Sequence, residues 1–485
     1  MDYTVTPLDD IAPLVASARA AYATGATAPQ AWRRTTLERL RDLIEAREPQ
    51  LLDALAADFG KPRFEAWTTE IGFTVSDINH TLAHLSSWMQ PEKVGTPLAF
   101  QPGSSYIVPE PVGVVAVIAP WNYPVQLLIL PMVAAIAAGN AIVAKPSELA
   151  PNTAAELISL IQALDEPAVV AVQGGVAETT ELLAQRFDHI IYTGNSRVAR
   201  IVMRAAAEHL TPVTLELGGK SPAIVSRHAN IDVAARRIAW GKFINAGQTC
   251  IAPDYVLVEQ PVHDQFVAAL GKHITDFYGA DPQQSGDFTR IVNSPHFHRL
   301  EKLLDSGTVA HGGVTDADTR YISPTVLTGV KADDPVMGEE IFGPILPVLA
   351  VESLEAAIGF VQAQSADGDK PLALYTFSES DRENDQVLAG ASSGGACVNG
   401  TLLHISNPNL PFGGVGESGM GAYHGKFGFD TFSHRRGVHT RSTKIDPAML
   451  YPPYTAKKQK LVRKGMTMPD PRDVAAKVRG AFRRG

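Results

Sequence analysis

Residues 112–144 contain no charged side chain, yet their pattern does not predict a membrane span. Prolines and polar residues interrupt the stretch, so no segment reaches the roughly 20 apolar residues needed to cross a bilayer. Short Val/Ile-rich pieces flank an Ala/Leu-rich piece, which is typical of buried strands joined by a buried helix. The pattern predicts a strand over 112–119, a loop over 120–124, a helix over 125–138 and a second strand from 141.

The same alternation continues downstream. We predict strands over 167–172, 189–192 and 213–216, and helices over 177–185 and 197–208. Alternating strands and helices indicate an α/β fold built on a doubly wound parallel sheet. In such sheets ligands bind outside the carboxyl ends of the strands, so the loop over 120–124 is a candidate ligand site.

The composition is that of a soluble α/β enzyme. Hydrophobic residues make up 45% of the 485 residues and charged residues 19%, and this length allows two or three domains. The net charge of −9 disfavours nucleic acid as the main partner. Residues 457–485 contain ten Lys or Arg and two Asp, so a basic tail follows a body whose net charge is −17.

Two cysteines, Cys250 and Cys397, are present, and neither lies in a Cys-x-x-Cys motif or beside clustered histidines. We therefore expect neither a disulfide scaffold nor a metal site. The N-terminal segment has early acidic residues and no apolar run, unlike a secretory signal. Two thiols without such a signal indicate a reducing cytoplasm. Cys397 is expected in the core, without a base partner.

Three polar residues stand where this fold would bury them. Cys250 follows Gly-Gln-Thr, a loop-like composition, although an isolated cysteine is more often a structural thiol. Glu216 ends an apolar strand, where burial would raise its pKa towards that of a general base; the alternative is an ordinary ion-pair partner. Asn122 follows the strand over 112–119 and is either a turn residue or an amide donor for an oxyanion.

Six motifs follow one another in a recognisable order. They are Pro120-Trp-Asn-Tyr-Pro124, Lys145-Pro-Ser-Glu148, Leu215-Glu-Leu-Gly-Gly-Lys220, Gly247-Gln-Thr-Cys250, Glu339-Glu-Ile-Phe-Gly-Pro344, and Pro411-Phe-Gly-Gly414 with Ser418-Gly419. In this order they resemble the aldehyde dehydrogenases, from about residue 10 to about residue 440. Arg236-Arg-Ile-Ala-Trp-Gly-Lys242 and Met420-Gly-Ala-Tyr-His-Gly-Lys426 resemble its class three branch, which includes fatty, aromatic and coniferyl aldehyde dehydrogenases.

The resemblance implies a role for each candidate. Cys250 is the expected nucleophile, Glu216 the base that activates water against a thioester intermediate, and Asn122 an oxyanion donor. NAD is the expected cofactor, with NADP accepted. The implied cofactor contacts are Trp121, Lys145, Glu148, Gly194, Asn195, Leu217, Glu340 and Phe342. One turn departs from the family pattern, since Asn195 stands where Ser is usual and Ala199 replaces a second glycine, which should tighten helix packing.

The resemblance also implies a doubly wound, Rossmann-like cofactor domain, an α/β catalytic domain and a small β element for oligomerisation. We assign residues 1–90 and 111–217 to the cofactor domain, 218–417 to the catalytic domain, 91–110 and 418–450 to the oligomerisation element, and 451–485 to the basic tail. The family analogy implies a homodimer. Tyr123 and Phe412 are expected to line an apolar approach to Cys250, which predicts an aromatic or medium- to long-chain aliphatic aldehyde as substrate.

Two other functions stay open on the sequence. An acyl-transferring enzyme would pass the thioester to coenzyme A, but it needs no water-activating base such as Glu216. A non-catalytic aldehyde-binding protein needs neither Cys250 nor Glu216. Product analysis with and without coenzyme A tests the first alternative, and the absorbance of reduced cofactor tests the second.

The basic tail predicts a short helix with Asp470 as N-cap and Pro471 at its first position. Val474, Val478 and Phe482 then share one face among basic residues. Three modest apolar anchors make a poor interfacial helix, so we expect this segment to dock on the acidic body or a partner subunit, or to be disordered. Weak contact with an anionic membrane surface is the alternative; no transmembrane span is expected.

Overall fold

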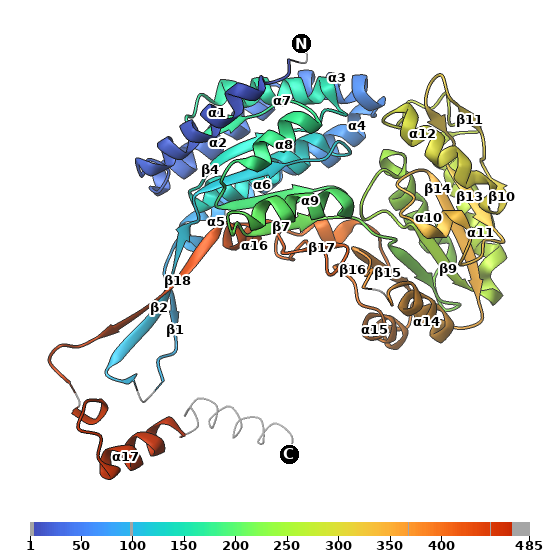
Figure 1. Ribbon diagram of the computed structural model, residues 1–485. Coiled ribbons are helices and arrows are strands. Elements are labelled where there is room, and N and C mark those ends of the chain that lie inside the picture. Colours follow the sequence, from blue (N-terminus) through green and yellow to red (C-terminus); the bar gives the residue numbers. More distant parts are fainter. Residues whose placement is uncertain (1–3, 98–99, 367, 447, 468–485) are drawn as a thin grey trace. The chain divides into compact units, whose positions relative to one another are not determined.

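The computed structural model describes residues 4–97, 100–366, 368–446 and 448–467. Contacts divide the chain into two units (Figure 1). The larger unit is Met1–Trp88 with Pro111–Phe432, and the smaller unit is Met89–Glu110 with Ser433–Gly485. The helix predicted from Asp470 lies outside the described residues.

A six-stranded sheet in the larger unit has the order β17-β7-β6-β3-β4-β5. All neighbours are parallel except β17, which runs antiparallel to β7. The chain order reverses between β3 and β6, so the topological switch point lies at the carboxyl ends of these two strands. The strands are β3 (Val114–Ile118), β4 (Ala141–Lys145), β5 (Val169–Ala171), β6 (His189–Thr193), β7 (Val213–Glu216) and β17 (Gly419–Met420).

Helices cover both faces of this sheet. On one face α1, α8 and α9 share an apolar core with the strands, which includes Val15, Val114, Ile190 and Val202. On the other face α6 packs on β3 and β4, with α2, α5, α7 and α16 around it. The helices are α1 (Leu8–Ala23), α2 (Gln30–Ala46), α3 (Glu48–Phe59), α4 (Arg63–Ala66), η1 (Trp67–Ile71), α5 (Gly72–Trp88), α6 (Pro124–Ala138), α7 (Pro151–Leu164), α8 (Val176–Ala184), α9 (Ser196–Ala207) and α16 (Gly425–Thr431).

The uncharged stretch forms the predicted strand, loop, helix and strand. Every residue of β3, α6 and β4 is buried, which explains why the segment carries no charge. Pro124 opens α6, where a missing N–H costs nothing. Gly139 ends it with φ of 92°, a left-handed conformation that favours glycine. None of the described helices is long and apolar enough to cross a membrane.

A seven-stranded sheet follows, with the order β10-β13-β14-β9-β8-β15-β16. It is parallel except for the edge strand β10, and α10, α11, α14 and α15 pack on it. Its strands are β8 (Pro222–Val225), β9 (Tyr255–Glu259), β10 (Thr308–His311), β13 (Thr325–Thr328), β14 (Ile345–Val351), β15 (Ala373–Phe377) and β16 (Gly395–Val398), with a separate pair β11 (Thr315–Asp316) and β12 (Tyr321–Ile322). The helices are α10 (Ile231–Phe243), α11 (His263–Tyr278), α12 (Ser294–Glu301), α13 (Pro335–Gly338), α14 (Leu354–Gln364) and α15 (Asp381–Gly390).

The smaller unit contains a three-stranded sheet of order β1-β2-β18. Its strands are β1 (Glu92–Val94), β2 (Gly103–Pro111) and β18 (Ser433–Arg441). The basic segment beyond this sheet begins with a helix, α17 (Ala456–Met466), that the sequence did not predict. The Thr455 side chain caps α17 by accepting a hydrogen bond from the Lys458 N–H.

Candidate active site

Cys250 lies between α10 and β9, after a strained turn. Residues 245–247 have φ values of 53°, 50° and 73°, an unusual run for residues other than glycine. The Asn245 side chain donates to the backbone carbonyls of Asn122, at 2.9 Å, and Gln248, at 3.0 Å. The Gln248 amide in turn donates to the Asn245 carbonyl at 3.0 Å. These bonds fix the backbone that presents Cys250.

The loop after β3 contacts the same segment. The Asn122 side chain, 3% exposed, donates from Nδ2 to the Gln248 carbonyl at 3.0 Å. The Tyr123 hydroxyl lies 2.7 Å from the Thr249 hydroxyl. The loop at the carboxyl end of β3, which the sequence indicated as a ligand site, therefore adjoins the residues that precede Cys250.

Glu216 ends β7 with an unusual lack of partners. Its side chain is 1% exposed, and neither carboxylate oxygen has a hydrogen-bond partner in the described part of the chain. Its backbone is held by pairing with Thr193 of β6 and Gly419 of β17. Burial raises the pKa of Glu216 well above its usual value. Glu216 also forms no ion pair with any described residue. Burying an acid without partners costs folding free energy, which favours a catalytic role for Glu216 over a structural one.

Two carboxylates act electrostatically on the Cys250 thiol. Cys250 is half-buried and free. Burial and the charges of Glu340 and Glu216 raise the pKa of its thiol, while the backbone N–H groups of Cys250 and Ile251 lower it. The upward effects dominate, so the resting thiol is protonated at neutral pH. Both acids must lie near the sulfur for their charges to act on it.

A cavity of about 610 Å³ opens onto Cys250. Tyr123 lines it, but Phe412 does not, contrary to the expectation from the sequence. The Phe412 ring is 4% exposed and packs against Tyr423 and His424, which removes it from the wall. The apolar and aromatic lining residues are Pro62, Phe64, Phe73, Tyr123, Leu127, Trp240, Ile244, Ile251, Phe277, Tyr278, Leu402 and Ile405.

The switch point of the first sheet carries the start of α9. A Cβ on Gly194 would lie 2.1 Å from the Tyr192 hydroxyl oxygen, so any other residue there would displace the Tyr192 side chain. Asn195 caps α9 by accepting from the Val198 N–H at 3.0 Å, and Ala199 is buried in the core beneath. The N–H groups at the start of a helix and its dipole suit a phosphate group.

Lys145 and Glu148 form an ion pair after β4. Lys145 Nζ lies 2.8 Å from Glu148 Oε2, and the two side chains are 4% and 36% exposed. The half-exposed carboxylate offers an acceptor for a sugar hydroxyl. Lys145 offsets part of the Glu148 charge. The pair also places a hydrogen-bond donor and an acceptor together at the carboxyl end of β4.

Glu340 packs against the loop after β7. A Cβ on Gly218 would lie 2.0 Å from Glu340 Oε2, so the glycine admits the carboxylate. Burial, together with the charge of Asp254, raises the pKa of Glu340 to about 8. Lys220 donates to the carbonyl of Glu339 at 2.8 Å and so holds this turn.

Three further residues predicted to contact the cofactor lie in the loops that follow β3 and β7 and in the segment that contains Glu340. The rings of Trp121 and Phe342 meet at 5.4 Å between centroids, and the Leu217 N–H donates to the Ser418 carbonyl at 3.1 Å. The carboxylates of Glu148 and Glu340, the Lys145 ammonium and the N-terminus of α9 match the ribose hydroxyls and pyrophosphate of a dinucleotide. The residues present therefore fit NAD(P).

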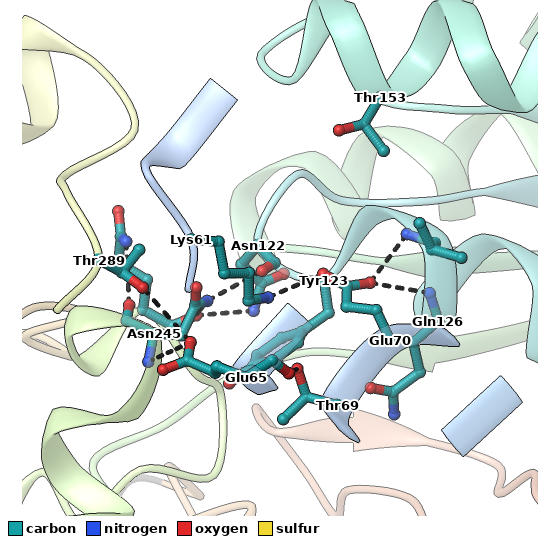
Figure 2. A network of polar contacts seen from close by, with 12 residues as sticks. Lys61, Glu65, Thr69, Glu70, Asn122, Tyr123, Gln126, Thr153, Asn245 and Thr289 are labelled. Carbon is teal, nitrogen blue, oxygen red and sulfur yellow. Dashed lines mark hydrogen bonds and ion pairs between the residues drawn. The ribbon is translucent and has the colours of Figure 1, made fainter. Parts of the chain in front are cut away.

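The sequence did not predict a buried polar network behind the cavity wall (Figure 2). Lys61 Nζ and Glu70 Oε1 lie 2.8 Å apart, and both side chains are fully buried. Glu70 Oε2 accepts from the N–H groups of Val125 and Gln126 at the start of α6, and Lys61 lies over the Tyr123 ring at 4.1 Å. Removing one partner of such a pair typically costs about 3–5 kcal/mol. The network thus fixes the loop that carries Asn122.

Tyr423 and His424 were also not predicted as site residues. The Tyr423 hydroxyl and His424 Nε2 are buried without a partner in the described residues. Burial raises the pKa of Tyr423 well above its usual value, and the charges of Glu216 and Cys250 add to this effect, so its hydroxyl lies near both. The sequence signal was an aromatic residue and a histidine between two glycines, Gly421 and Gly425, which both have positive φ.

Cys397 differs from its prediction. It is half-buried on β16, and its sulfur lies 3.2 Å from His404 Nδ1. The expectation of a core thiol without a base partner is therefore wrong, because the turn over Leu403–Ser406 returns a histidine beside it. Burial lowers the pKa of His404 to about 4 and raises the pKa of Cys397, so both groups are neutral and the pair is not a thiolate.

Comparisons with known proteins agree with this geometry. A profile of the Aldehyde dehydrogenase family matches residues 3–438. The chain is 48% identical over 453 residues to the "Aldehyde dehydrogenase, dimeric NADP-preferring" of Mus musculus, covering 93% of this chain and 99% of that protein. It is 47% identical over 442 residues to the 4,4'-diaponeurosporen-aldehyde dehydrogenase of Staphylococcus aureus, covering 90% and 95%.

A solved structure of Staphylococcus aureus AldH in a substrate-bound state has a TM-score of 0.91 at 45% identity, and the match covers 94% of this chain and 99% of that one. The motif order, the two sheets and these similarities lead to one assignment. This chain belongs to the aldehyde dehydrogenase family, in its class three-like branch, and is an NAD(P)-dependent oxidoreductase acting on aldehydes.

Proposed function

We propose that the chain oxidises an apolar aldehyde, aromatic or medium- to long-chain aliphatic, to the carboxylic acid. The observation that carries this proposal is the largely apolar cavity of about 610 Å³ that opens onto Cys250. Apolar walls favour substrates that bury hydrocarbon on binding, by about 0.8 kcal/mol for each CH₂ group.

Cys250 acts as the nucleophile in this proposal. Its thiol must first pass a proton to solvent water; burial and the nearby acids oppose this loss, and the N–H groups of Cys250 and Ile251 favour it. The thiolate then forms a C–S bond with the aldehyde carbon. The negative charge that develops on the aldehyde oxygen is stabilised by the Asn122 amide and the Cys250 backbone N–H.

NAD(P), when bound, supplies the acceptor for the hydride that leaves the tetrahedral carbon. We propose that the α9 N-terminus at Gly194 and Asn195 holds its pyrophosphate, and that Lys145 and Glu148 meet the adenosine ribose. Trp121, Leu217, Glu340 and Phe342 would surround the nicotinamide end. The Glu148 charge disfavours a 2′-phosphate, but Lys145 offsets part of it, so NAD is the expected cofactor with NADP accepted. The Mus musculus relative is named NADP-preferring.

Glu216 completes the reaction. A thioester remains on Cys250 after oxidation, and the Glu216 carboxylate takes a proton from the water that attacks it. This base distinguishes hydrolysis from transfer to coenzyme A. The unpartnered carboxylate oxygens support the role, because a hydrogen-bonded acid would be less available for proton transfer.

The substrate proposal predicts a rising specificity constant along an aliphatic series. We expect kcat/KM to increase by up to about fourfold per added carbon while the chain fills the cavity, and to be high for benzaldehyde and coniferaldehyde. The measurement is the absorbance of reduced cofactor across aldehydes of two to sixteen carbons. A preference for small polar aldehydes would contradict the proposal.

We further propose a homodimer that uses the three-stranded sheet of the smaller unit. Residues 1–90 and 111–217 would be the cofactor domain, 218–417 the catalytic domain, and 91–110 with 418–450 the oligomerisation element. The Mus musculus relative is named dimeric, and light scattering on the full chain should give twice the mass of one chain; a stable monomer or tetramer contradicts this. Two free thiols, Cys250 and Cys397, support action in the reducing cytoplasm.

A further inference from the structure

The charged side chains of the cavity wall all have one sign. Glu65 and Asp287 line the cavity, and no Lys, Arg or His is among the described residues that do. Asp287 is exposed, whereas Glu65 is half-buried. An apolar cavity with an acid in its wall and no basic side chain should bind aldehydes differently according to their charge and their hydrogen-bonding groups.

Glu65 is held in place through one of its two carboxylate oxygens. Oε1 accepts from the Asn245 N–H at 2.9 Å and lies 3.4 Å from the Thr289 hydroxyl (Figure 2). Both donors converge on the same oxygen, so Oε2 is the atom left for a bound molecule. The Asn245 bond also joins Glu65 to the turn that presents Cys250, which places this acid on the reacting side of the cavity.

Lys61 acts on the charge of Glu65 but forms no ion pair with it. Lys61 forms its ion pair with Glu70, at 2.8 Å, and these two fully buried charges offset each other. Glu65 makes no ion pair with any described residue. The cavity wall therefore carries an acid that has no ion-pair partner among the described residues.

We propose that Glu65 is a specificity-determining residue, which selects aldehydes that carry a hydrogen-bond donor such as a hydroxyl group and rejects aldehydes that carry a carboxylate. This inference rests on the proposed function. A hydroxyl can donate to Oε2, whereas a carboxylate in the cavity meets like charge and no cation. Like charges brought together at a low-dielectric site repel strongly.

The test compares substrates of similar size. We would measure kcat/KM for 3- and 4-formylbenzoate against their methyl esters, and for 3- and 4-(hydroxymethyl)benzaldehyde against the ethylbenzaldehydes. Wild type should prefer the ester over the anion, and Glu65→Gln should lower this preference at least about tenfold. The preference for hydroxymethyl over ethyl should fall about threefold or more. Asp287→Asn, at the exposed acid, is the matched control and should change each ratio less than about twofold.

The pH dependence gives a second readout. Burial raises the pKa of Glu65 to about 7, so its charge is present above that pH and is lost below it. The other ionisable groups that act on it are Lys61, Glu70, Tyr123 and Tyr278. Burial raises the pKa of both tyrosines, and they stay neutral. The ester-to-anion ratio should therefore fall between pH 8.5 and 6 in wild type and stay flat in Glu65→Gln.

Each outcome has a distinct meaning. The ratio cancels changes in Cys250 or Glu216 because both substrates share those steps. An active Glu65→Gln enzyme with unchanged ratios would overturn the role of Glu65. If that variant is inactive towards every aldehyde, the pH dependence in wild type decides, and a flat wild-type ratio overturns the inference. If wild type reduces the cofactor with none of these aldehydes or the aliphatic series, the proposed function fails instead.

Discussion

A Glu216→Gln variant should release about one equivalent of reduced cofactor per active site in a rapid burst and then turn over at least about 100-fold more slowly than wild type. Oxidation needs the Cys250 thiolate and the cofactor, whereas hydrolysis of the thioester needs a base for water. An amide keeps the shape of the carboxyl group but cannot take that proton. Stopped-flow absorbance of reduced cofactor measures both phases.

The surroundings of Glu216 make this substitution unusually clean. Neither of its oxygens has a hydrogen-bond partner among the described residues, so an amide breaks no bond. A matched control is Glu259→Gln, since Glu259 also ends a buried parallel strand, β9, but is paired with Arg227 at 2.7 Å. That variant should keep wild-type kinetics, because its acid lies in an ion pair rather than at the thiol.

The stalled species can be identified by its chemistry. Hydroxylamine should cleave the accumulated thioester and restore turnover in Glu216→Gln, since it is a nucleophile that needs no base. Coenzyme A should not accelerate wild type, as it would for an acyl-transferring enzyme. Loss of the burst itself in Glu216→Gln would show that the base assignment is wrong or that the variant disturbs the site.

The first sheet could be predicted because its signals are local. Buried strands such as β3 need apolar residues on both faces, and Gly139 ends α6 through its own φ. Each predicted helix or strand of this sheet begins and ends within two residues of the observed one. The candidate residues followed from the same logic, since Asn122 lies in the loop after β3 and Glu216 is the last residue of β7.

The polar network of Lys61, Glu65 and Glu70 could not be predicted, because its contacts are not local in the sequence. Lys61, Glu65 and Glu70 lie among charged and polar residues on the short helices α4 and η1, or just before them, in a pattern that also suits an exposed helix. Only tertiary contacts with the start of α6 and with Asn245 bury them. The spacing of residues along the sequence does not predict a contact between residues that are more than 50 positions apart.

Two corrections arise from the same limit. Phe412 follows Asn-Leu-Pro and Cys397 follows Gly-Gly-Ala, so neither stands in a periodic apolar pattern that would predict the direction of its side chain. Phe412 joins an aromatic cluster with Tyr423 and His424. Cys397 meets His404 because a short turn reverses the chain. The neighbours of both side chains come from turns and loops whose geometry composition alone does not determine.

The two thiols allow the nucleophile to be tested against an internal control. Cys250→Ala should reduce aldehyde oxidation by on the order of 10⁴-fold or more, because the C–S bond that carries the reaction cannot form. Cofactor binding should stay near wild type, since no proposed cofactor contact involves the sulfur. Steady-state assays and calorimetric titration with NAD measure the two properties separately.

Cys397→Ala makes the same chemical change at the other cysteine and should leave turnover within about twofold of wild type. Its sulfur contacts His404, and both groups are neutral, so this pair supplies no thiolate for attack. Hydrolysis of a nitrophenyl ester should likewise be lost in Cys250→Ala and kept in Cys397→Ala, because ester cleavage would use the same thiol without the cofactor. If Cys397→Ala abolished both activities while Cys250→Ala retained them, the nucleophile would be Cys397 and the cavity at Cys250 would need another role.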